Sequence, residues 1–343
     1  MSKLLDIEQL HVSYRSPSGD IRAIEDVTMQ MDRGEFVAVV GESGSGKSTL
    51  ALAIIGLLPS RAWVRGRMIY KGVNLTELKG REWLKYRGRE IGMIFQEPMT
   101  SLNPIEKVAN QLGETITSQS LPTQVPPSDG TQKTTLDFAN RDELRNKALV
   151  QKEVLRWLQT VRISDPESAA ERYPFQLSGG MMQRVMIAMA LSLHPSLLLA
   201  DEPTTALDVT TQAQILKLMK NLIDELNTSI LLITHDLGVA AQVADRVIVL
   251  YAGNIVEEGP AVRVFSNPLH PYTKGLLKCY PKSVATTERL ETIPGSVPDS
   301  LVEIKGCKFA DRCPFVTEMC HGEKPRYIEV ESNHYVRCTL FYK

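Results

Sequence analysis

Hydrophobic residues follow two different spacings along this chain of 343 residues. Apolar and polar residues alternate over Leu4–Ser13 and, after a turn at 16–19, over Ile21–Met31, which predicts two strands that pack beside the next apolar run. Continuous apolar runs predict buried strands at Phe36–Val40, Ile91–Phe95, Leu197–Ala200 and Ile230–Ile233. Apolar residues recur at helical spacing over 181–193 and 215–226. This strand–helix alternation predicts an α/β fold with a mostly parallel sheet.

The remaining pattern divides the chain into three parts. Residues 97–177 are helical and polar, and a stretch at 118–140 rich in Ser, Thr, Gln and Pro predicts a flexible insertion. A hairpin is expected over 247–256, after which the composition shifts to Pro, His and Cys. The predicted parts are an α/β core (1–96 and 178–262), a helical subdomain (97–177) and a C-terminal regulatory or metal-binding extension (263–343).

Composition narrows the classes of function only slightly. Apolar residues make up 43% and charged residues 23% of the chain, as in ordinary globular proteins, and the net charge of −1 lacks the basic excess that nucleic-acid binding needs. No apolar run reaches the roughly 18 residues of a membrane-spanning helix; the best candidate, Met186–Ala200, is interrupted by His194 and Pro195. Acidic residues near the N-terminus replace the apolar centre of a signal peptide, so we expect a cytoplasmic protein.

The segment Gly41–Thr49 fits the phosphate-loop pattern G-x-x-x-x-G-K-S/T between a predicted strand and a predicted helix. Glycines let backbone N–H groups turn towards the phosphates of a nucleotide, and the helix N-terminus adds the positive end of its dipole. Lys47 would reach the β- and γ-phosphates, and the Ser48 hydroxyl would bind Mg²⁺. The residues expected to contact the nucleotide here are Gly41, Ser43, Gly44, Gly46, Lys47, Ser48 and Thr49.

Polar side chains follow three of the predicted strands, where ligands gather in open α/β sheets. Asp201 and Glu202 come directly after one strand; Asp201 could hold Mg²⁺, and Glu202 could orient or deprotonate the attacking water. His235 and Gln96 follow two others, so His235 could position the water and Gln96 could bind Mg²⁺ or water. Structural roles remain the alternative for both.

Two further features suggest contacts with the nucleotide. Ser178, Gly179 and Gly180 precede a predicted helix, whose N-terminus is a second potential anion site. Both sites could not easily face one nucleotide in a single chain, so a dimer that pairs one subunit's loop with the other's second site is expected. Tyr14 follows the first strand and could stack on adenine, or simply pack on its own sheet.

The combination of motifs resembles the ATP-binding subunits of ABC transporters. The resemblance rests on Tyr14, Gly41–Thr49, Gln96, Leu177–Gly180, Asp201–Glu202, Ala206–Asp208 and His235, and covers residues 4 to about 262. It implies a RecA-like P-loop NTPase core with an antiparallel β subdomain, ATP and Mg²⁺ as cofactors, and a nucleotide-sandwich dimer. It also implies that Asp208 acts across the dimer and that the loop after Gln96 meets the permease.

A narrower resemblance is to the peptide/nickel group of binding-protein-dependent importers. It rests on Gln96–Pro104, Asn267–Thr273 and Ile293–Gly295. It implies an ATPase at the cytoplasmic face of the membrane that works with a second ATPase subunit, two permease subunits and, indirectly, an extracytoplasmic solute-binding protein. Di- and oligopeptides are the expected cargo, with oligosaccharides or nickel as alternatives. A soluble ABC ATPase acting on nucleic acid is the alternative from a different class.

Four cysteines in the extension suggest a metal centre. Cys307, Cys313, Cys320 and Cys338 lack the close C-x₂₋₄-C pairs of structural zinc sites, and four thiolates are what an iron–sulfur cluster needs. The flanking residues resemble the tail of dipeptide and oligopeptide importer ATPases, some of which carry a 4Fe–4S cluster. The resemblance therefore implies such a cluster, with zinc and free thiols as the alternatives.

Overall fold

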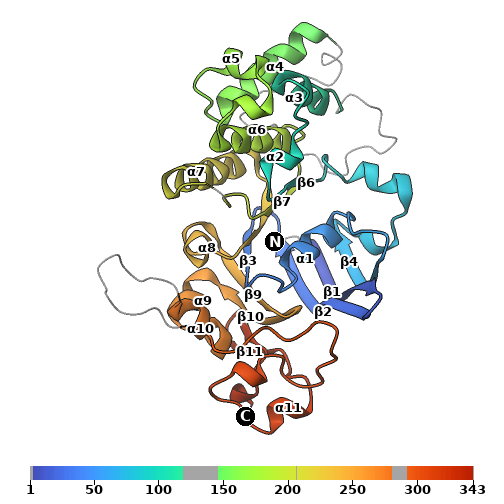
Figure 1. The fold of residues 1–343 in the computed structure, drawn as a ribbon, viewed down its shortest axis with the longest axis vertical. Helices are drawn as coiled ribbons and strands as arrows, with labels where there is room; N and C mark the ends of the chain where they lie inside the picture. The colour runs from blue at the N-terminus through green and yellow to red at the C-terminus, as the bar shows by residue number, and fades with distance from the viewer. Residues whose placement is uncertain (1–2, 119–145, 206, 280–291, 343) are drawn as a thin grey trace. The chain divides into compact units, whose positions relative to one another are not determined.

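The computed structural model describes residues 3–118, 146–205, 207–279 and 292–342. Contacts divide the chain into two compact units: the first comprises residues 1–78 and 231–343, and the second comprises residues 79–230. Most of the insertion predicted at 118–140 lies outside the described residues. Figure 1 labels the elements of both units.

The first unit contains a four-stranded antiparallel sheet in the order β2-β1-β4-β5. Its strands are β1 (Lys3–Ser16), β2 (Gly19–Asp32), β4 (Ala62–Tyr70) and β5 (Val73–Asn74). β1 is the central partner, because Leu5 pairs with Met31 on one side and with Tyr70 on the other. β1 therefore pairs with both β2 and β4, in a sheet separate from the one that contains the strand at 36–40.

A second sheet in the same unit is mixed. It runs in the order β11-β12-β10-β9-β3-β8. Its strands are β3 (Phe36–Val40), β8 (Ser229–Thr234), β9 (Arg246–Tyr251), β10 (Asn254–Pro260), β11 (Ile328–Glu331) and β12 (His334–Val336). β3 and β9 are parallel, whereas the pairs β9–β10, β10–β12 and β12–β11 are antiparallel. The expected mostly parallel sheet thus continues into an antiparallel edge that the C-terminal extension completes.

The α-helices of this unit are short. They are α1 (Lys47–Ile54), α8 (Leu237–Val243), α9 (Ala261–Ser266), α10 (Pro271–Lys278) and α11 (Met319–Gly322).

The C-terminal extension shares the hydrophobic core of the first unit. Tyr272 of α10 and Phe309 pack in one buried cluster with Val249 and Tyr251 of β9. Burial of these large side chains ties residues beyond 263 to the sheet.

The second unit places a parallel strand pair among helices. β6 (Ile91–Ile94) pairs with β7 (Leu197–Asp201), whose five residues are all buried. Its helices are α2 (Pro98–Ser101), α3 (Val108–Thr117), α4 (Lys147–Thr160), α5 (Pro166–Glu171), α6 (Gly179–Leu191) and α7 (Val209–Leu226). The segment after Gln96, which the family resemblance describes as a loop, begins with the short helix α2. Pro98 at its first position suits a helix N-terminus.

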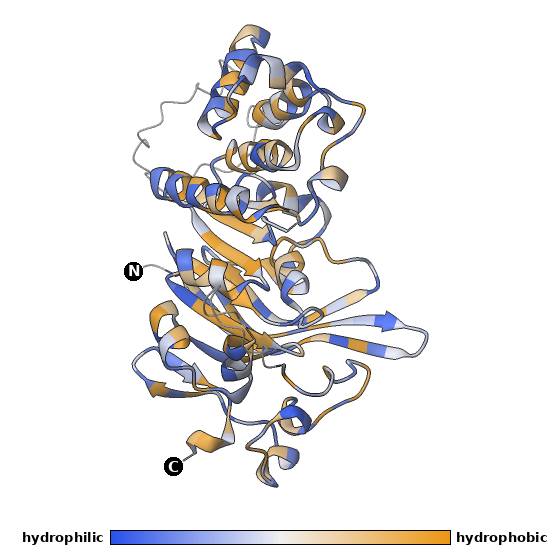
Figure 2. Cartoon of the chain, turned by 60° about the vertical axis from the view of Figure 1, so that its left-hand side comes forward, coloured by the Kyte–Doolittle hydropathy of each residue, from blue (hydrophilic) through white to orange (hydrophobic). Residues whose placement is uncertain are grey.

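Burial follows the hydrophobic pattern of the sequence. Figure 2 colours the central strands largely as hydrophobic, whereas the outer strands and the helices show both colours. In α7 the buried face consists of Ile215, Leu216, Leu218, Met219, Leu222, Ile223 and Leu226. Among the described residues, no helix has both the length and the apolar character needed to span a membrane.

Candidate nucleotide-binding site

The phosphate loop lies in the first unit between β3 and α1, as predicted. The Lys47 side chain is buried, and its Nζ donates hydrogen bonds to the carbonyl oxygens of Gly41 (2.8 Å) and Glu42 (2.9 Å). The same Glu42 oxygen accepts from the Ser45 N–H at 3.2 Å. Through these bonds the loop wraps around Lys47 and holds the ammonium group of the lysine in place.

Two glycines show why the loop needs this residue type. Gly46 has φ +100°, and a Cβ there would lie 2.4 Å from the Ala23 carbonyl oxygen. Gly44 has φ +77° and would present a Cβ to open space. Both backbone conformations are unfavourable for residues other than glycine.

The start of α1 fits a phosphate group. Its N-cap, Gly46, provides no side-chain cap, so the N–H groups of the first turn remain suited to an anion. Ser43, Gly44 and Ser48 are exposed around it. Tyr14 Oη donates to Thr49 Oγ1 at 3.1 Å, which joins β1 to α1; stacking of the Tyr14 ring on adenine remains a prediction.

The predicted general base lies in the second unit, beside the predicted glutamine. Asp201 is buried at the end of β7, and Glu202 follows it. Glu202 Oε2 accepts from Gln96 Nε2 at 3.2 Å and from Thr205 Oγ1 at 3.0 Å. The parallel pairing of β6 and β7 brings these side chains together, as the strand-end argument predicted. His235 belongs to the first unit, where it is exposed directly after β8.

Glu202 adopts an unusual backbone conformation, with φ +46°. Such left-handed conformations are costly for residues with a side chain, and they cluster at functional sites. This conformation turns the chain sharply after the buried strand. The carboxylate is thereby fixed next to Gln96 and Thr205.

The second predicted anion site also lies in the second unit, at the start of α6. Ser178 is the N-cap of α6, and its Oγ accepts from the Met181 N–H at 3.3 Å. A cavity of about 330 Å³ opens here, lined by residues that include Ser178, Gly179, Gly180, Arg184, Asp208 and Thr211. The structure therefore brings Ser178, Gly179, Gly180 and Asp208 together around one cavity.

Asp208 is the N-cap of α7 and is held by a residue that sequence reasoning missed. Thr211 donates to the Asp208 carboxylate from Oγ1 at 2.7 Å and from its N–H at 3.0 Å. These bonds hold the pKa of Asp208 below its ordinary value. The Asp-x-x-Thr spacing before a helix is a capping signal that could have identified Thr211. Ala206, part of the same predicted motif, lies outside the described residues.

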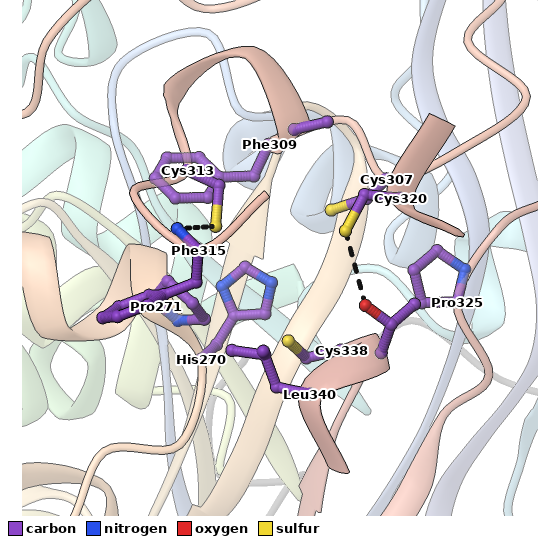
Figure 3. Close-up of a pocket in the computed structure, with 12 residues that line it drawn as sticks. His270, Pro271, Cys307, Phe309, Cys313, Phe315, Cys320, Pro325, Cys338 and Leu340 are labelled. Carbon is purple, nitrogen blue, oxygen red and sulfur yellow. Dashed lines mark hydrogen bonds between the residues drawn. The ribbon is translucent and has the colours of Figure 1, made fainter. Parts of the chain in front are cut away.

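The predicted 4Fe–4S cluster is contradicted. Cys307, Cys313, Cys320 and Cys338 do line one cavity, and Figure 3 shows their side chains around it. However, that cavity has a volume of only about 10 Å³, roughly the space for one water molecule. No group of three or more His, Cys, Asp or Glu side chains in the described parts of the chain is placed to hold a metal ion. This finding also argues against the zinc alternative.

The four cysteine side chains lie in different surroundings. Burial raises the pKa of Cys307 to about 11, and burial also raises the pKa of Cys313 and of Cys338. At Cys320, hydrogen bonds with Thr339 and Thr317 outweigh the effect of burial and lower the pKa of the thiol. Cys320 lies within 3.4 Å of Thr339 Oγ1. The four cysteines are free thiols in this structure.

Family models match both the core and the extension. The model described as "ABC transporter" matches residues 24–205, and the model described as "Oligopeptide/dipeptide transporter, C-terminal region" matches residues 256–320. The first match contains the phosphate loop, Gln96, the start of α6 and the Asp201–Glu202 pair.

Curated relatives match nearly the whole chain. A dipeptide transport ATP-binding protein of Lactococcus lactis subsp. cremoris is 42% identical over 98% of this chain and 91% of its own. An oligopeptide transport ATP-binding protein of Bacillus subtilis is 43% identical over 100% of this chain and 90% of its own length. An oligopeptide transport ATP-binding protein of Haemophilus influenzae is 44% identical over 93% of this chain and 92% of its own length.

Solved structures of ATP-binding cassettes share the fold. A dimeric cassette in a post-hydrolysis state, bound to ADP and Pi, is 29% identical with a TM-score of 0.61, and the match covers 75% of this chain and 98% of that one. A subunit of an ABC transporter complex from Clostridium perfringens is 27% identical with a TM-score of 0.60, covering 78% and 92%. This chain belongs to the ABC transporter family, as an ATP-binding subunit with the C-terminal region of oligopeptide/dipeptide transporters.

Proposed function

We propose that this chain powers the import of di- and oligopeptides by hydrolysing ATP. The observation that carries the proposal is the relationship across the whole chain, extension included, to proteins named for dipeptide and oligopeptide transport. The neutral charge balance gives no support to the alternative of an ATPase acting on nucleic acid.

Within the proposed site, each residue has a stated task. Lys47 and the N–H groups at the start of α1 bind the phosphates of ATP, and Ser48, Gln96 and Asp201 hold Mg²⁺. When bound there, Mg²⁺ would neutralise charge on the phosphates. Glu202 accepts the proton of the attacking water, and His235 positions that water. The contact between Gln96 and Glu202 supports this assignment because it holds the carboxylate in place.

The proposed assembly has two ATPase subunits. Ser178, Gly179, Gly180 and Asp208 of one subunit close over the ATP held by the other subunit, and the cavity at the start of α6 supports this role. The dimeric structure of a related cassette is consistent with such a pair. The chain lies at the cytoplasmic face of the membrane, and the loop after Gln96 meets one of two permease subunits. A solute-binding protein outside the membrane delivers the cargo.

The cargo can be tested in cells that express the chain from a plasmid in place of the chromosomal gene. We expect wild-type cells to accumulate radiolabelled di- and tripeptides, and cells with Glu202→Gln to lose this uptake. The variant Glu225→Gln, on the exposed side of α7, serves as the matched control and should leave uptake unchanged.

Affinity purification from membranes should also recover two permease subunits. If Glu202→Gln cells lost nickel or oligosaccharide uptake while their peptide uptake stayed unchanged, the proposed cargo would be contradicted. Recovery of the chain with nucleic acid and without permeases would contradict the transport role altogether.

A further inference from the structure

Glu42, the second residue of the phosphate loop, is held by the C-terminal extension through both its backbone and its side chain. Its N–H donates to the Tyr272 hydroxyl at 2.9 Å. Its carboxylate receives two bonds from Arg312, from Nη1 at 2.9 Å and from Nη2 at 3.1 Å. Its carbonyl oxygen accepts from Lys47 at 2.9 Å. The phosphate-binding lysine and the extension thus share Glu42 as an anchor.

The ion pair between Arg312 and Glu42 is of the strong kind. It is bidentate, and the Arg312 side chain is only 7% exposed while that of Glu42 is 25% exposed. A planar guanidinium that pairs with both carboxylate oxygens fixes geometry as well as charge. Exposed ion pairs contribute little by comparison.

Arg312 is itself fixed by its surroundings. Its Nε donates to the Pro294 carbonyl oxygen at 2.9 Å, and a Cβ on Gly295 would lie 3.2 Å from its Cγ. Its guanidinium carbon lies 5.7 Å from the ring centre of Tyr251 and 5.9 Å from that of Phe309. The side chain is therefore prearranged to meet Glu42, and its geometry depends on the extension.

Tyr272 is equally well placed. It is fully buried, and its ring centre lies 4.5 Å from that of Tyr251 and 5.4 Å from that of Phe309. Tyr272 lies in the first turn of α10, where His270 caps the helix by accepting from the Tyr272 N–H at 3.0 Å. Two segments noted in the sequence, 267–273 and 293–295, thus supply or support the groups that hold Glu42.

We propose that Arg312 and Tyr272 are positioning residues for ATP binding, which set the phosphate loop through Glu42. The extension is then a part of the nucleotide site that acts on the loop, in addition to any role in assembly. A loop anchored at Glu42 keeps the Gly41 and Glu42 carbonyl groups where Lys47 needs them, so the lysine is held ready for the phosphates. Releasing the anchor lets the loop sample other conformations and lowers the affinity for ATP. The proposal rests on ATP binding by the loop and does not depend on the transported cargo.

The test measures equilibrium binding of a non-hydrolysable ATP analogue to the full chain. Arg312→Met removes the ion pair and keeps most of the packing, and we expect the affinity to fall by at least about fivefold. Arg312→Lys should retain part of the affinity for the analogue, because lysine keeps the positive charge but not the bidentate geometry. Tyr272→Phe, which keeps the ring and removes only the hydroxyl, should weaken binding even if Arg312→Met fails to fold. Hydrogen exchange should become faster at the amides of the loop in each variant.

Arg337→Met is the matched control. Arg337 also belongs to the extension, but it donates to Asp26 Oδ2 of β2 at 3.0 Å and to the Ile255 carbonyl oxygen at 3.2 Å, and not to Glu42. The control should leave the affinity for the analogue unchanged while lowering thermal stability. In a double-mutant cycle, Glu42→Gln and Arg312→Met should be non-additive. The proposal is overturned if Arg312→Met and Tyr272→Phe bind the analogue as tightly as the wild type does, or if Arg337→Met weakens binding to the same degree.

Discussion

At the scale of single residues, Glu202 combines two features that are typical of functional residues. Its backbone has φ +46°, and its carboxylate is held by Gln96 and Thr205. Sequence reasoning could place Glu202 at a strand end, because a buried run leads straight into it. The backbone conformation and the Thr205 contact come from the turn that follows, which no periodicity describes.

Replacing Glu202 by Gln keeps the shape of the side chain and removes the proposed general base. We expect ATP binding to be preserved and steady-state hydrolysis to fall by about 10²- to 10⁴-fold, the usual contribution of a general base. Steady-state turnover and equilibrium ATP binding should be measured on the same preparation. Near wild-type hydrolysis in Glu202→Gln would show that another group takes the proton.

His270 predicts a dependence of stability on pH. Burial lowers the pKa of His270 to about 4, whereas an unfolded histidine has a pKa of about 6.5. Between these values the unfolded state binds more protons, so stability is retained above pH about 6.5 and falls as the pH drops towards 4, by up to about 3 kcal/mol. His270→Asn keeps an acceptor for the α10 cap and should flatten this loss, measured by urea unfolding at several pH values.

The exposed His321 supplies the control for that experiment. His321→Asn should lose stability between pH 6.5 and 4 as steeply as the wild type does, since both proteins keep His270. An equally steep loss in His270→Asn would mean that other groups control acid unfolding.

At the scale of elements, the starts of α6 and α7 meet closely. A Cβ on Gly180 would lie 2.8 Å from Thr211 Cγ2. Gly180→Ala should therefore destabilise the protein by about 1–3 kcal/mol, the usual cost of overpacking. Thermal or urea unfolding would measure the change.

Adding Thr211→Ser to Gly180→Ala tests whether contact with the Thr211 methyl group causes the loss of stability. Serine lacks the Cγ2 methyl group but keeps the hydroxyl that bonds to Asp208, so the double variant should recover most of the lost stability. A double variant as unstable as Gly180→Ala would show that the methyl contact is not the cause.

The elements differ in how well their sequence predicts them. β3, β7 and α7 follow from local patterns, because each is a buried run or an amphipathic repeat. β4 was missed because Arg65 and Arg67 interrupt any apolar run, and it is a strand because it pairs with β1. The antiparallel end of the sheet depends on the pairing of β12 with β10, some 80 residues earlier, and such a contact leaves no local pattern.

The same reasoning explains the outcome for the site. The phosphate loop could be predicted because its residues are contiguous, and Gln96 with Glu202 because parallel strands end at one edge. The bonds from Arg312 to Glu42 join residues far apart in sequence and could not be predicted. Four cysteines, with flanking residues that resemble the tail of importer ATPases, suggested a cluster that the cavity is too small to hold.

At the scale of the whole molecule, the predicted site residues are distributed over two units. The phosphate loop belongs to one unit, and Glu202 with the start of α6 belongs to the other. Under the proposed assembly, Ser178 and Gly180 act on ATP bound by a partner. Dilute, isolated chain should therefore bind ATP and hydrolyse it slowly. Turnover per molecule should rise with chain concentration, or when the partner ATPase from the membrane complex is added. Full turnover at high dilution would contradict a shared site.

The central claim is that ATP hydrolysis by this chain drives peptide import. The most direct measurement is peptide uptake into liposomes that contain the purified transporter, with the solute-binding protein on one side and ATP with this chain on the other. We predict uptake that requires ATP, is stimulated by peptide-loaded binding protein, and is abolished in Glu202→Gln. ATP hydrolysis that is insensitive to loaded binding protein, together with no peptide uptake by the wild-type complex, would contradict the account.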